Sequence, residues 1–469
     1  NPNPANDNNT DVVDVSVFTS GIVVELGELA TVNSNPQPAV ATNIHINNIE
    51  QIDAAAGSDS AEANNWLVNN YESDVRWALT PFNNGYFEQL ISASTDTTMP
   101  NTRLNFTNFG SMQGGAGDEI SNISEGNNIT GTYVAGDGRR NLRFDGVVAT
   151  SLVVVDIDDS LISVTGNGNT LLRVSSDAAD AALNVDNIWT VDGANSGTFL
   201  VNDGSGTPFS LDFFSVNQLQ GGTGVDTFNI AANGNLIDGA INGGAGSNRV
   251  NAVQAIADLR FGLNEIATGL TVGASYPNGI TSVDALATRS GIIDLINVSE
   301  LQANSATAVT LYSGDVANYA WTIDGIANVL TGNNQSLLFS DVSIVAGGAG
   351  NDNFTVTQLG IVRDAIDGGL GSDTLSYSAV DQPLTFSVDP SVTENVDVQL
   401  ANIETLNTSD NGNTLIGGSV VNAWNITEQN GGMLTYNNGA ADLSMTYSNV
   451  ANVVGGPGSD VFTLSADGA

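Results

Sequence analysis

The sequence predicts an all-β protein, a right-handed parallel β-solenoid built from four degenerate modules with a few short helical insertions. Three observations predict this fold. Glycine-rich turns recur along the 469 residues, they come in pairs, and a short β-prone run follows each turn. The two turns of a pair are separated by about 21 residues, which is typical of one coil of a solenoid whose repeats stack on their neighbours.

The charge of the chain is strongly negative because cations are scarce. The net charge is -41, although only 13% of the residues are charged, and Lys and Arg together number 10, all of them Arg. Such a surface repels nucleic acid, which excludes that class of partner. It is suited to a salty or calcium-rich medium, where cations screen or bridge the carboxylates.

The cysteine count and the chain start favour an exported protein. The sequence has no Cys, so disulfides and thiolate metal sites are excluded, and no run approaches the roughly 20 apolar residues of a membrane span. It begins Asn1-Pro2 rather than with Met or a signal peptide, as expected of a mature chain whose export signal has been removed or lay elsewhere. We therefore expect an extracellular protein, at a bacterial cell surface.

Turns of the pattern G-G-x-G define the coil length. The turn at Gly221 is followed by one at Gly243, and the turn at Gly347 by one at Gly368, so the two pairs have nearly the same offset. The turn at Gly114 has a degenerate partner at 135–138, again at this offset. The turn at Gly455 has no partner before residue 469.

A fixed order of features precedes each first turn. An acidic residue comes first, with an apolar residue two positions after Glu50, Asp159 and Glu404 and directly after Glu300. A Trp strand follows, and then an aromatic residue with a hydroxyl neighbour. The Trp residues are Trp77, Trp189, Trp321 and Trp424, and the aromatic pairs are Phe106-Thr107, Phe214-Ser215, Phe339-Ser340 and Tyr447-Ser448. The unequal spacing of these copies favours stacked coils with loops over a propeller or sandwich of fixed unit.

These features predict four modules and the local structure within them. The modules are 1–138, with an N-terminal cap or partner-pairing segment at 1–9, then 139–246, 247–371 and 372–469, the last with an incomplete coil. Runs at 151–157, 353–357 and 384–388 are β-branched or alternate apolar with polar residues, which predicts strands. The Ala-rich spacing at 175–183 and 252–259 predicts short helical insertions.

The glycine turns carry the recognisable chemistry. In G-G-x-G-x-D followed by an apolar residue, the glycines expose backbone carbonyls, the Asp points inward as a ligand and the apolar residue starts a strand. The units at 347–355, 368–376, 455–463 and 221–229 resemble the haemolysin-type calcium-binding (RTX) nonapeptide, which in that family stacks in tandem into a parallel β-roll with calcium between neighbouring turns. Here the units are not in tandem.

The resemblance implies Ca²⁺ as a cofactor, with a defined set of ligands. The implied metal ligands are Gly348, Gly350, Asp352, Gly369, Gly371, Asp373, Asp226 and Asp460.

A coil of this length would place the paired turns one above the other, about 4.8 Å apart. Asp352 would then lie over Asp373, Asp226 over Asn248, and Glu119 over Arg140. The alternative is a structural ladder in which each Asp accepts hydrogen bonds from backbone N–H groups.

The whole module resembles repeats of large secreted adhesin-like and filamentous-haemagglutinin-like bacterial proteins. That resemblance implies a non-enzymatic extracellular structural protein, a subunit of a self-assembling surface filament or matrix that associates head to tail. The alternatives are a repeat segment of a giant adhesin that binds glycans or a cell surface, and a β-helix enzyme that degrades polysaccharide.

Candidate catalytic groups are sparse. His45 alternates with apolar neighbours, the carboxylates at 156, 158 and 159 are expected to face solvent or a turn, and Arg139, Arg140 and Arg143 are expected to pair with local carboxylates. We therefore expect no enzymatic activity.

The two ends of the sequence are in phase. The run at 10–17 resembles the run at 372–379, which follows the second turn of a pair. We expect the chain to be either a subunit whose terminal coil is completed by a neighbour, or a fragment of a longer repeat protein. Unpaired strand edges at both ends would favour head-to-tail addition.

Overall fold

The computed structural model describes most of the chain after residue 160. The described ranges are 161–174, 185–201, 209–263 without 237, and 292–466 with gaps at 315–317, 361, 363, 393 and 438–440. Before residue 161 they comprise the strands named below and Phe109.

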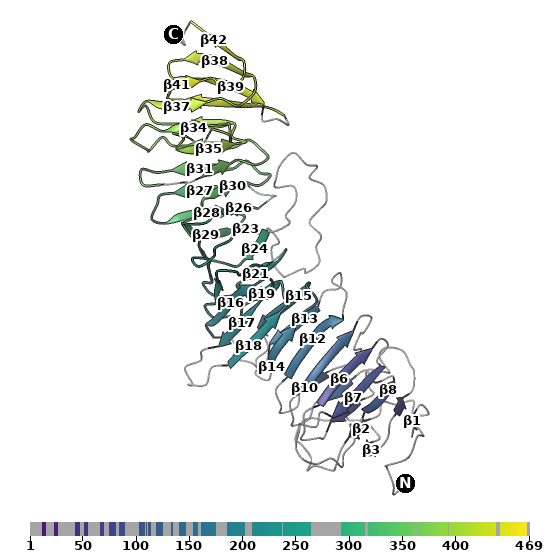
Figure 1. The fold of residues 1–469 in the computed structure, drawn as a ribbon. Coiled ribbons are helices and arrows are strands. Elements are labelled where there is room, and N and C mark those ends of the chain that lie inside the picture. Colours follow the sequence, from purple (N-terminus) through teal and green to yellow (C-terminus); the bar gives the residue numbers. More distant parts are fainter. Residues whose placement is uncertain are drawn as a thin grey trace. The chain divides into compact units, whose positions relative to one another are not determined.

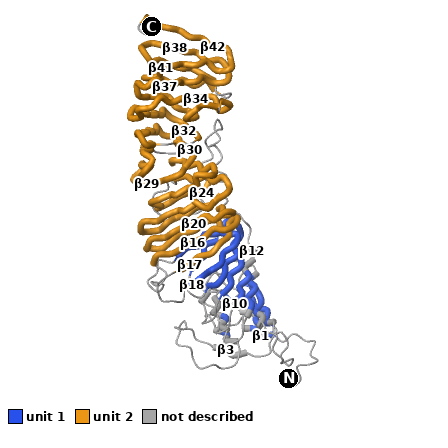
Figure 2. The backbone as a smooth tube through the Cα atoms, turned by 60° about the vertical axis from the view of Figure 1, so that its left-hand side comes forward, with its two compact units in different colours: residues 1–175, 209–216 blue, residues 176–208, 217–469 orange. Residues whose placement is uncertain are grey.

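Within these described ranges the protein is all-β, with predominantly parallel sheets and no helix (Figure 1). It divides into two compact units, residues 1–175 with 209–216 and residues 176–208 with 217–469 (Figure 2). No helix in the described ranges is long and apolar enough to cross a membrane.

Unit 1 contains one long strand ladder and two smaller strand groups. The long ladder comprises, in order of pairing, β1 (Val12–Val15), β4 (Gln51–Ala54), β8 (Arg103–Thr107), β7 (Asn84–Gln89), β6 (Val75–Thr80), β10 (Glu119–Ser124), β12 (Arg140–Gly146), β14 (Leu161–Thr165) and β18 (Phe209–Phe214). The smaller groups comprise β3 (Asn43–Ile46), β2 (Val23–Leu26), β5 (Trp66–Asn69), β9 (Ser111–Gln113) and β11 (Tyr133–Val134), and the pair β13 (Val153–Ile157) and β15 (Thr170–Val174).

Unit 2 contains two ladders, and the chain passes alternately through them. The first, which we call ladder 1, comprises in order of pairing β17 (Ser196–Val201), β16 (Asn187–Gly193), β20 (Thr227–Ile230), β22 (Arg249–Asn251), β25 (Glu300–Gln302), β29 (Gln335–Ser340), β28 (Asn328–Gly332), β27 (Ala320–Ile323), β31 (Asn353–Val356), β33 (Thr374–Ser376), β36 (Thr405–Asn407), β40 (Asp442–Ser448), β39 (Gly431–Asn437), β38 (Asn422–Glu428) and β42 (Asp460–Leu464).

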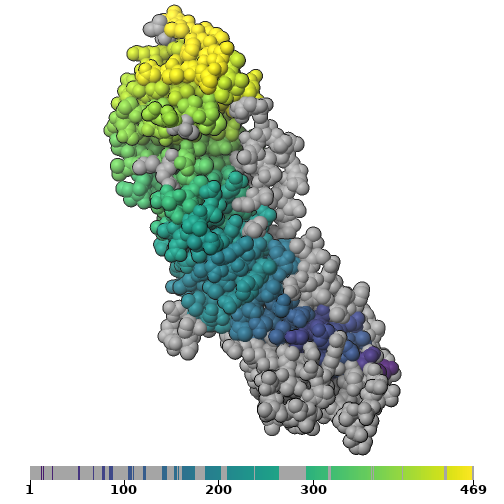
Figure 3. Space-filling view, in the orientation of Figure 1, coloured from purple at the N-terminus to yellow at the C-terminus, as the bar shows by residue number. Residues whose placement is uncertain are grey.

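The second, ladder 2, is parallel throughout its described pairings. It comprises β19 (Gln218–Gln220), β21 (Ala240–Asn242), β24 (Ile292–Ile296), β23 (Leu259–Leu263), β26 (Val309–Tyr312), β30 (Ile344–Ala346), β32 (Ala365–Asp367), β35 (Val398–Ala401), β34 (Thr385–Ser387), β37 (Asn413–Ile416) and β41 (Val450–Val454). In the space-filling view the colour bands of unit 2 follow one another in chain order (Figure 3).

Alternation of side chains along each strand produces the core. Phe354 and Val356 of β31 are buried, whereas Asn353 between the turn and Phe354 is exposed. Strands of successive coils place apolar residues beside apolar residues. For example, β31 and β33 pair in parallel with Phe354 beside Leu375. The predicted strands at 353–357 and 384–388 are present as β31 and β34.

The strands that carry Trp77, Trp189, Trp321 and Trp424 differ from the expectation that all strands pair in parallel. Trp77, Trp189, Trp321 and Trp424 are fully buried, and each lies on a strand with an antiparallel neighbour. Three of these Trp rings stack on an aromatic ring of the following parallel strand, in the pairs Trp189–Phe228, Trp321–Phe354 and Trp424–Phe462.

The antiparallel pair of β28 and β29, next to the Trp321 strand, has a turn that was not predicted from the sequence. Gly332 pairs with Gln335, so the connection between β28 and β29 is Asn333-Asn334. Both residues have positive φ, 45° and 59°. Two consecutive left-handed residues form a type I′ hairpin turn, whose twist matches that of the flanking antiparallel strands.

The predicted helical insertion at 252–259 is wrong. The segment forms a turn in which the Ala255 N–H donates to the Ala252 carbonyl at 3.0 Å, and β23 begins at Leu259. The Ala252 N–H donates to the Gln302 carbonyl of the next coil. The backbone donor at the start of the segment is therefore bonded to a neighbouring coil. The other predicted insertion, at 175–183, lies outside the described residues, and the four-module division stays a prediction.

Candidate functional site

The stacked glycine turns connect ladder 2 to ladder 1. The turn at 347–352 joins β30 to β31, and the turn at 368–373 joins β32 to β33. Because β31 and β33 pair with Asn353 beside Thr374, the two turns lie one above the other. The prediction that paired turns stack is confirmed here and for the pair at Gly221 and Gly243, where Thr227 lies beside Arg249. Glu119 lies beside Arg140 as predicted, although the turns that precede these two residues lie outside the described residues.

The Asp of each first turn anchors the start of a Trp strand. Asp352 is buried; its Oδ2 accepts from the Gly348 N–H at 3.0 Å and its Oδ1 accepts from the Tyr319 N–H at 2.6 Å. Tyr319 stands two residues before Trp321. The carboxylate therefore satisfies a donor of its own turn and a backbone donor that precedes β27.

Asp226 repeats this arrangement. Its Oδ2 accepts from the Gly222 N–H at 2.9 Å and its Oδ1 from the Asn187 N–H at 3.2 Å, two residues before Trp189. Burial raises the pKa of Asp226 to about 6, against the hydrogen bonds from Asn187 and Gly222, which lower it. The hydrogen bonds thus favour the ionised carboxylate of Asp226, and burial opposes them.

Asp460 makes the same contact at the last turn. The Asn422 N–H donates to Asp460 Oδ1 at 3.3 Å, two residues before Trp424, and Asn422 Nδ2 donates to the same oxygen at 2.6 Å. The three Asp residues at 226, 352 and 460 thus have one structural role. Their positions were predicted from the sequence, but their partners on the Trp strands were not.

Asp373, in a second turn, is different. Its Oδ1 accepts from the Asp352 N–H at 2.6 Å, while its Oδ2 is buried and has no hydrogen-bond partner. Its own N–H donates to Glu404 Oε2 at 2.7 Å. The pKa of Asp373 is raised to about 7, chiefly by burial and also by the charges of Glu404, Asp352 and Asp367, against the hydrogen bond from the Asp352 N–H, which lowers it.

The turns stack so closely that two of the glycines are obligatory. Gly369 and Gly371 have φ of 85° and 136°. A Cβ on them would lie 2.2 Å from the Gly348 carbonyl oxygen and 2.2 Å from the Gly350 carbonyl oxygen, respectively. The Leu370 N–H donates to the Gly348 carbonyl at 2.8 Å, so the turns are joined by direct backbone hydrogen bonds.

These contacts do not fit a calcium cage between the turns at 347 and 368. Calcium takes six to eight oxygen ligands. Both oxygens of Asp352 and one oxygen of Asp373 accept backbone N–H bonds, and the Gly348 carbonyl accepts from Leu370. The geometry favours the alternative of a structural ladder, in which the carboxylates accept from backbone donors.

The remaining candidate residues are dispersed. His45 lies on β3, Asp156 on β13, and Arg140 and Arg143 on β12, where Arg140 is buried. The carboxylates at 158 and 159 and the guanidinium at 139 lie outside the described residues. The strands that carry the described candidates belong to separate parts of unit 1, so no shared site brings them together.

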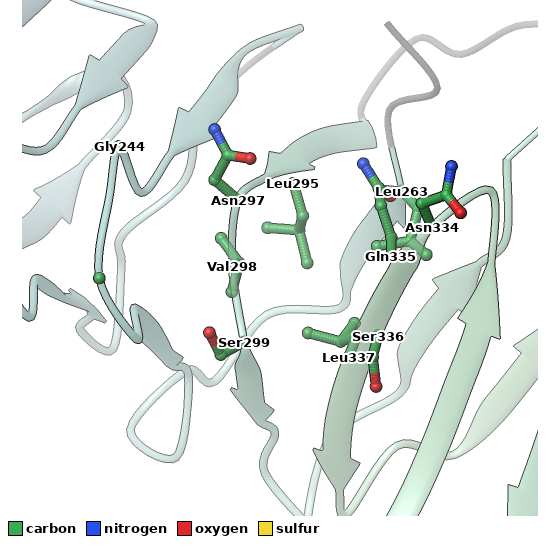
Figure 4. A pocket seen from close by; sticks show the side chains of 11 residues that line it. Gly244, Leu263, Leu295, Asn297, Val298, Ser299, Asn334, Gln335, Ser336 and Leu337 are labelled. Atoms are coloured by element: carbon green, nitrogen blue, oxygen red, sulfur yellow. The ribbon is translucent and has the colours of Figure 1, made fainter. Parts of the chain in front are cut away.

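Unit 2 also contains a pocket with a volume of about 240 Å³. Figure 4 shows the amide side chains of Asn297, Asn334 and Gln335 around it. Its other lining residues are Gly244, Gly246, Leu263, Leu295, Val298, Ser299, Ser336 and Leu337. The lining includes no carboxylate and no other titratable side chain, so it lacks the paired acids of a glycosidase.

Two residues that complete the turns were not predicted as part of the site. Glu404 was identified only as the acidic residue before a strand, and Asn402 was not singled out. Asn402 has φ of 50° and its Nδ2 donates to Asp367 Oδ1 at 2.8 Å. The signal in the sequence is an Asn two residues before the acidic residue, since Asn is the residue other than Gly that most readily adopts the left-handed conformation.

Compared with models of known protein families, with curated proteins and with solved structures, the chain matches none.

Proposed function

We propose that this chain is a non-enzymatic structural protein, a right-handed parallel β-solenoid of four degenerate modules that assembles head to tail into an extracellular filament or matrix. The composition supports an exported location, because a net charge of -41 needs cations to screen or bridge the carboxylates. The parallel pairing of strands that follow the two turns of a pair, as in β31 with β33 and β20 with β22, supports the solenoid.

The observation that carries the assembly proposal is the exposed apolar surface of β42. Phe462 is 43% exposed, and Val461 and Leu464 are each 59% exposed. Phe354 stands at the same place relative to its turn and Trp partner, and it is 0% exposed because β33 follows it. Among the described strands β42 pairs only with β38, so its other edge is available to a further strand.

An edge strand of unit 1 has complementary properties. Among the described strands β1 pairs only with β4, and Val12 on it is 51% exposed. The run that includes β1 resembles the run that includes β33, the strand that covers Phe354. We therefore infer that β1 of a second copy covers β42, with Val12 beside Val461 and Val13 beside Phe462.

Strand addition of this kind is favourable for two reasons. It pairs backbone N–H and C=O groups that an edge leaves to water, and it removes apolar side chains from water at about 25 cal/mol per Å². In an acid-rich chain the contact would strengthen as salt or divalent cations screen the repulsion between copies.

A cysteine cross-link tests the register directly, because the native chain has no Cys. The variants Val12→Cys and Val461→Cys are purified separately and mixed under oxidising conditions. Neighbouring parallel strands lie about 4.8 Å apart, within the Cα separation that a disulfide spans. We expect a disulfide-linked heterodimer, whereas a mixture of Val461→Cys with Leu338→Cys, at another exposed position, should not cross-link.

Light scattering and electron microscopy test the assembly itself. We expect fibres whose length grows with protein concentration, and a shift to monomer for Phe462→Glu. A monomer at all concentrations in millimolar calcium, with no cross-link between the cysteine variants, would show that a further coil of the same polypeptide or a different partner covers β42.

A further inference from the structure

The sequence contains one Asp-Pro peptide bond, between Asp389 and Pro390, and it lies in the turn that follows β34. The Val392 N–H donates to the Asp389 carbonyl at 3.1 Å, which closes a β-turn with Pro390 at its second position. An Asp side chain can close a five-membered ring on its own carbonyl carbon. The amide that it would break here is the tertiary amide of a proline, whose nitrogen departs as a secondary amine.

Two donors meet at the carbonyl oxygen of this bond. Ser387 Oγ donates to the Asp389 carbonyl at 3.2 Å, beside the Val392 N–H. The same Oγ accepts from the Asp389 N–H at 3.0 Å, so its hydrogen is left for the carbonyl. Paired donors at a carbonyl oxygen stabilise the negative charge that develops there when the carbonyl carbon is attacked.

The strands around the turn fix both donors in place. Ser387 is fully buried and pairs with Gln399 of β35 and Ile416 of β37. Gln399 Nε2 donates to the Val392 carbonyl, which fixes the far end of the turn. The donors therefore point at the carbonyl oxygen before any reaction begins, which is the condition for electrostatic catalysis.

The carboxyl group of Asp389 is held next to the bond. Its Oδ1 accepts from the Ser391 N–H at 2.9 Å and from Ser391 Oγ at 2.6 Å, so the group lies on the Pro390 side of its own residue. Asp389 is 1% exposed, and its Oδ2 is buried with no hydrogen-bond partner among the described residues. A buried polar atom without a partner is costly and calls for a structural or chemical role.

We propose that the bond between Asp389 and Pro390 is a self-cleavage site. Asp389 Oδ2 forms a bond to the carbonyl carbon of its own residue, the bond from that carbon to the Pro390 nitrogen breaks, and the carboxyl proton moves to the nitrogen. The products are a cyclic anhydride at Asp389 and a chain that begins at Pro390. Water then opens the anhydride and leaves a C-terminal Asp389, so one water molecule is consumed for one peptide bond.

The surroundings allow both halves of the reaction. Pro390 and Ser391 are exposed, so the amine can depart into solvent and water can reach the anhydride from the same side. The reaction takes place once in each chain, which is compatible with a structural protein. The inference does not rest on the proposed filament.

The two products should stay together under native conditions. β35 belongs to the product 390–469 and pairs with β32 and β34 of the product 1–389, and β36 pairs with β33 across the same cut. The cleaved protein should therefore keep its fold and separate into two chains only in denaturant.

The test compares folded protein with protein unfolded in urea, both in mildly acidic buffer, by mass spectrometry of the denatured products. Because the fold supplies the two donors, we expect the product that begins at Pro390 to form at least about tenfold faster in the folded protein. A folded rate equal to or below the urea rate would overturn the proposal, since it would reflect only the lability that any Asp-Pro bond has.

Water enriched in heavy oxygen reports the intermediate. It can open an anhydride at either carbon, so we expect label in the side-chain carboxyl of Asp389 as well as in its new α-carboxyl. Label in the α-carboxyl alone would show direct hydrolysis of the peptide bond and would overturn the proposed step.

Ser387→Ala removes one donor and should slow cleavage of the folded protein by at least about tenfold, with the rate in urea unchanged. The matched control is Ser343→Ala. Ser343 is also buried, and its Oγ accepts from the Val309 N–H at 3.0 Å and donates to the Val309 carbonyl at 3.2 Å, the same pair of bonds at a site without an Asp-Pro bond. Equal rates for the two variants would contradict the role of Ser387. Asp389→Glu keeps the carboxyl group but cannot close a five-membered ring, and it should yield no product that begins at Pro390.

Discussion

Trp424 stacks on Phe462 with ring centroids 5.8 Å apart and planes within 4° of parallel, yet only Trp424 is buried. The equivalent pair Trp321 and Phe354 has centroids 5.5 Å apart, and both of its rings are buried. The stacking is therefore a property of two neighbouring strands, whereas the burial of the second ring depends on a third strand.

The same truncation should have different costs at these two positions. We expect Phe354→Ala to destabilise unit 2 by about 3–5 kcal/mol, because it leaves a cavity in a packed core. Phe462→Ala should cost about 1–2 kcal/mol, because its ring already contacts water. Urea unfolding of both variants measures the difference, and equal losses would show that β42 is covered in solution by another strand.

The close stacking of turns makes a second prediction. Gly371→Ala should destabilise the protein by about 2 kcal/mol or more, since it combines an unfavourable φ with a contact at 2.2 Å to the Gly350 carbonyl oxygen. Gly412→Ala is the matched control, because Gly412 has φ of 82° but no atom within 4 Å of an added Cβ. It should cost about 1 kcal/mol from φ alone. Thermal unfolding distinguishes the two, and equal costs would argue against close turn stacking.

The anchoring role of the first-turn carboxylates makes a third prediction. Asp352→Asn should destabilise by about 1–3 kcal/mol, because its amide NH₂ would face the N–H of Gly348 or of Tyr319, both of which need an acceptor. Chemical unfolding measures the loss, and an unchanged free energy of unfolding would contradict the role assigned to Asp352.

The buried acids predict the pH dependence of stability. Asp226 and Asp373 have pKa values raised to about 6 and about 7. Both bind protons more tightly in the folded state, so the free energy of unfolding should fall as the pH rises from about 4 to about 7. A urea series across this range measures it. A free energy of unfolding that rises over the same interval would show that other groups control the stability.

Much of the local order was predictable from the sequence. The spacing of Gly347 and Gly368 predicted that Asp352 would lie next to Asp373, and the alternation at 353–357 predicted β31. The periodicity of turns and apolar residues is a local property, so it can be recognised without any tertiary contact. The Asn333-Asn334 turn was a missed signal of the same local kind, as two consecutive Asn residues favour a hairpin.

The sequence by itself determined the all-β class, the coil length and the positions of the stacked turns, because these depend on period and on turn-forming residues. Only the tertiary structure decided which donors the carboxylates meet. Asp352 accepts from Gly348 and Tyr319, while the equivalent glycine of the next turn, Gly369, donates to Asp367, and Asp373 Oδ2 is buried with no hydrogen-bond partner. Identical G-G-x-G-x-D motifs thus have different chemistry, because the direction of a backbone N–H depends on the coils above and below it.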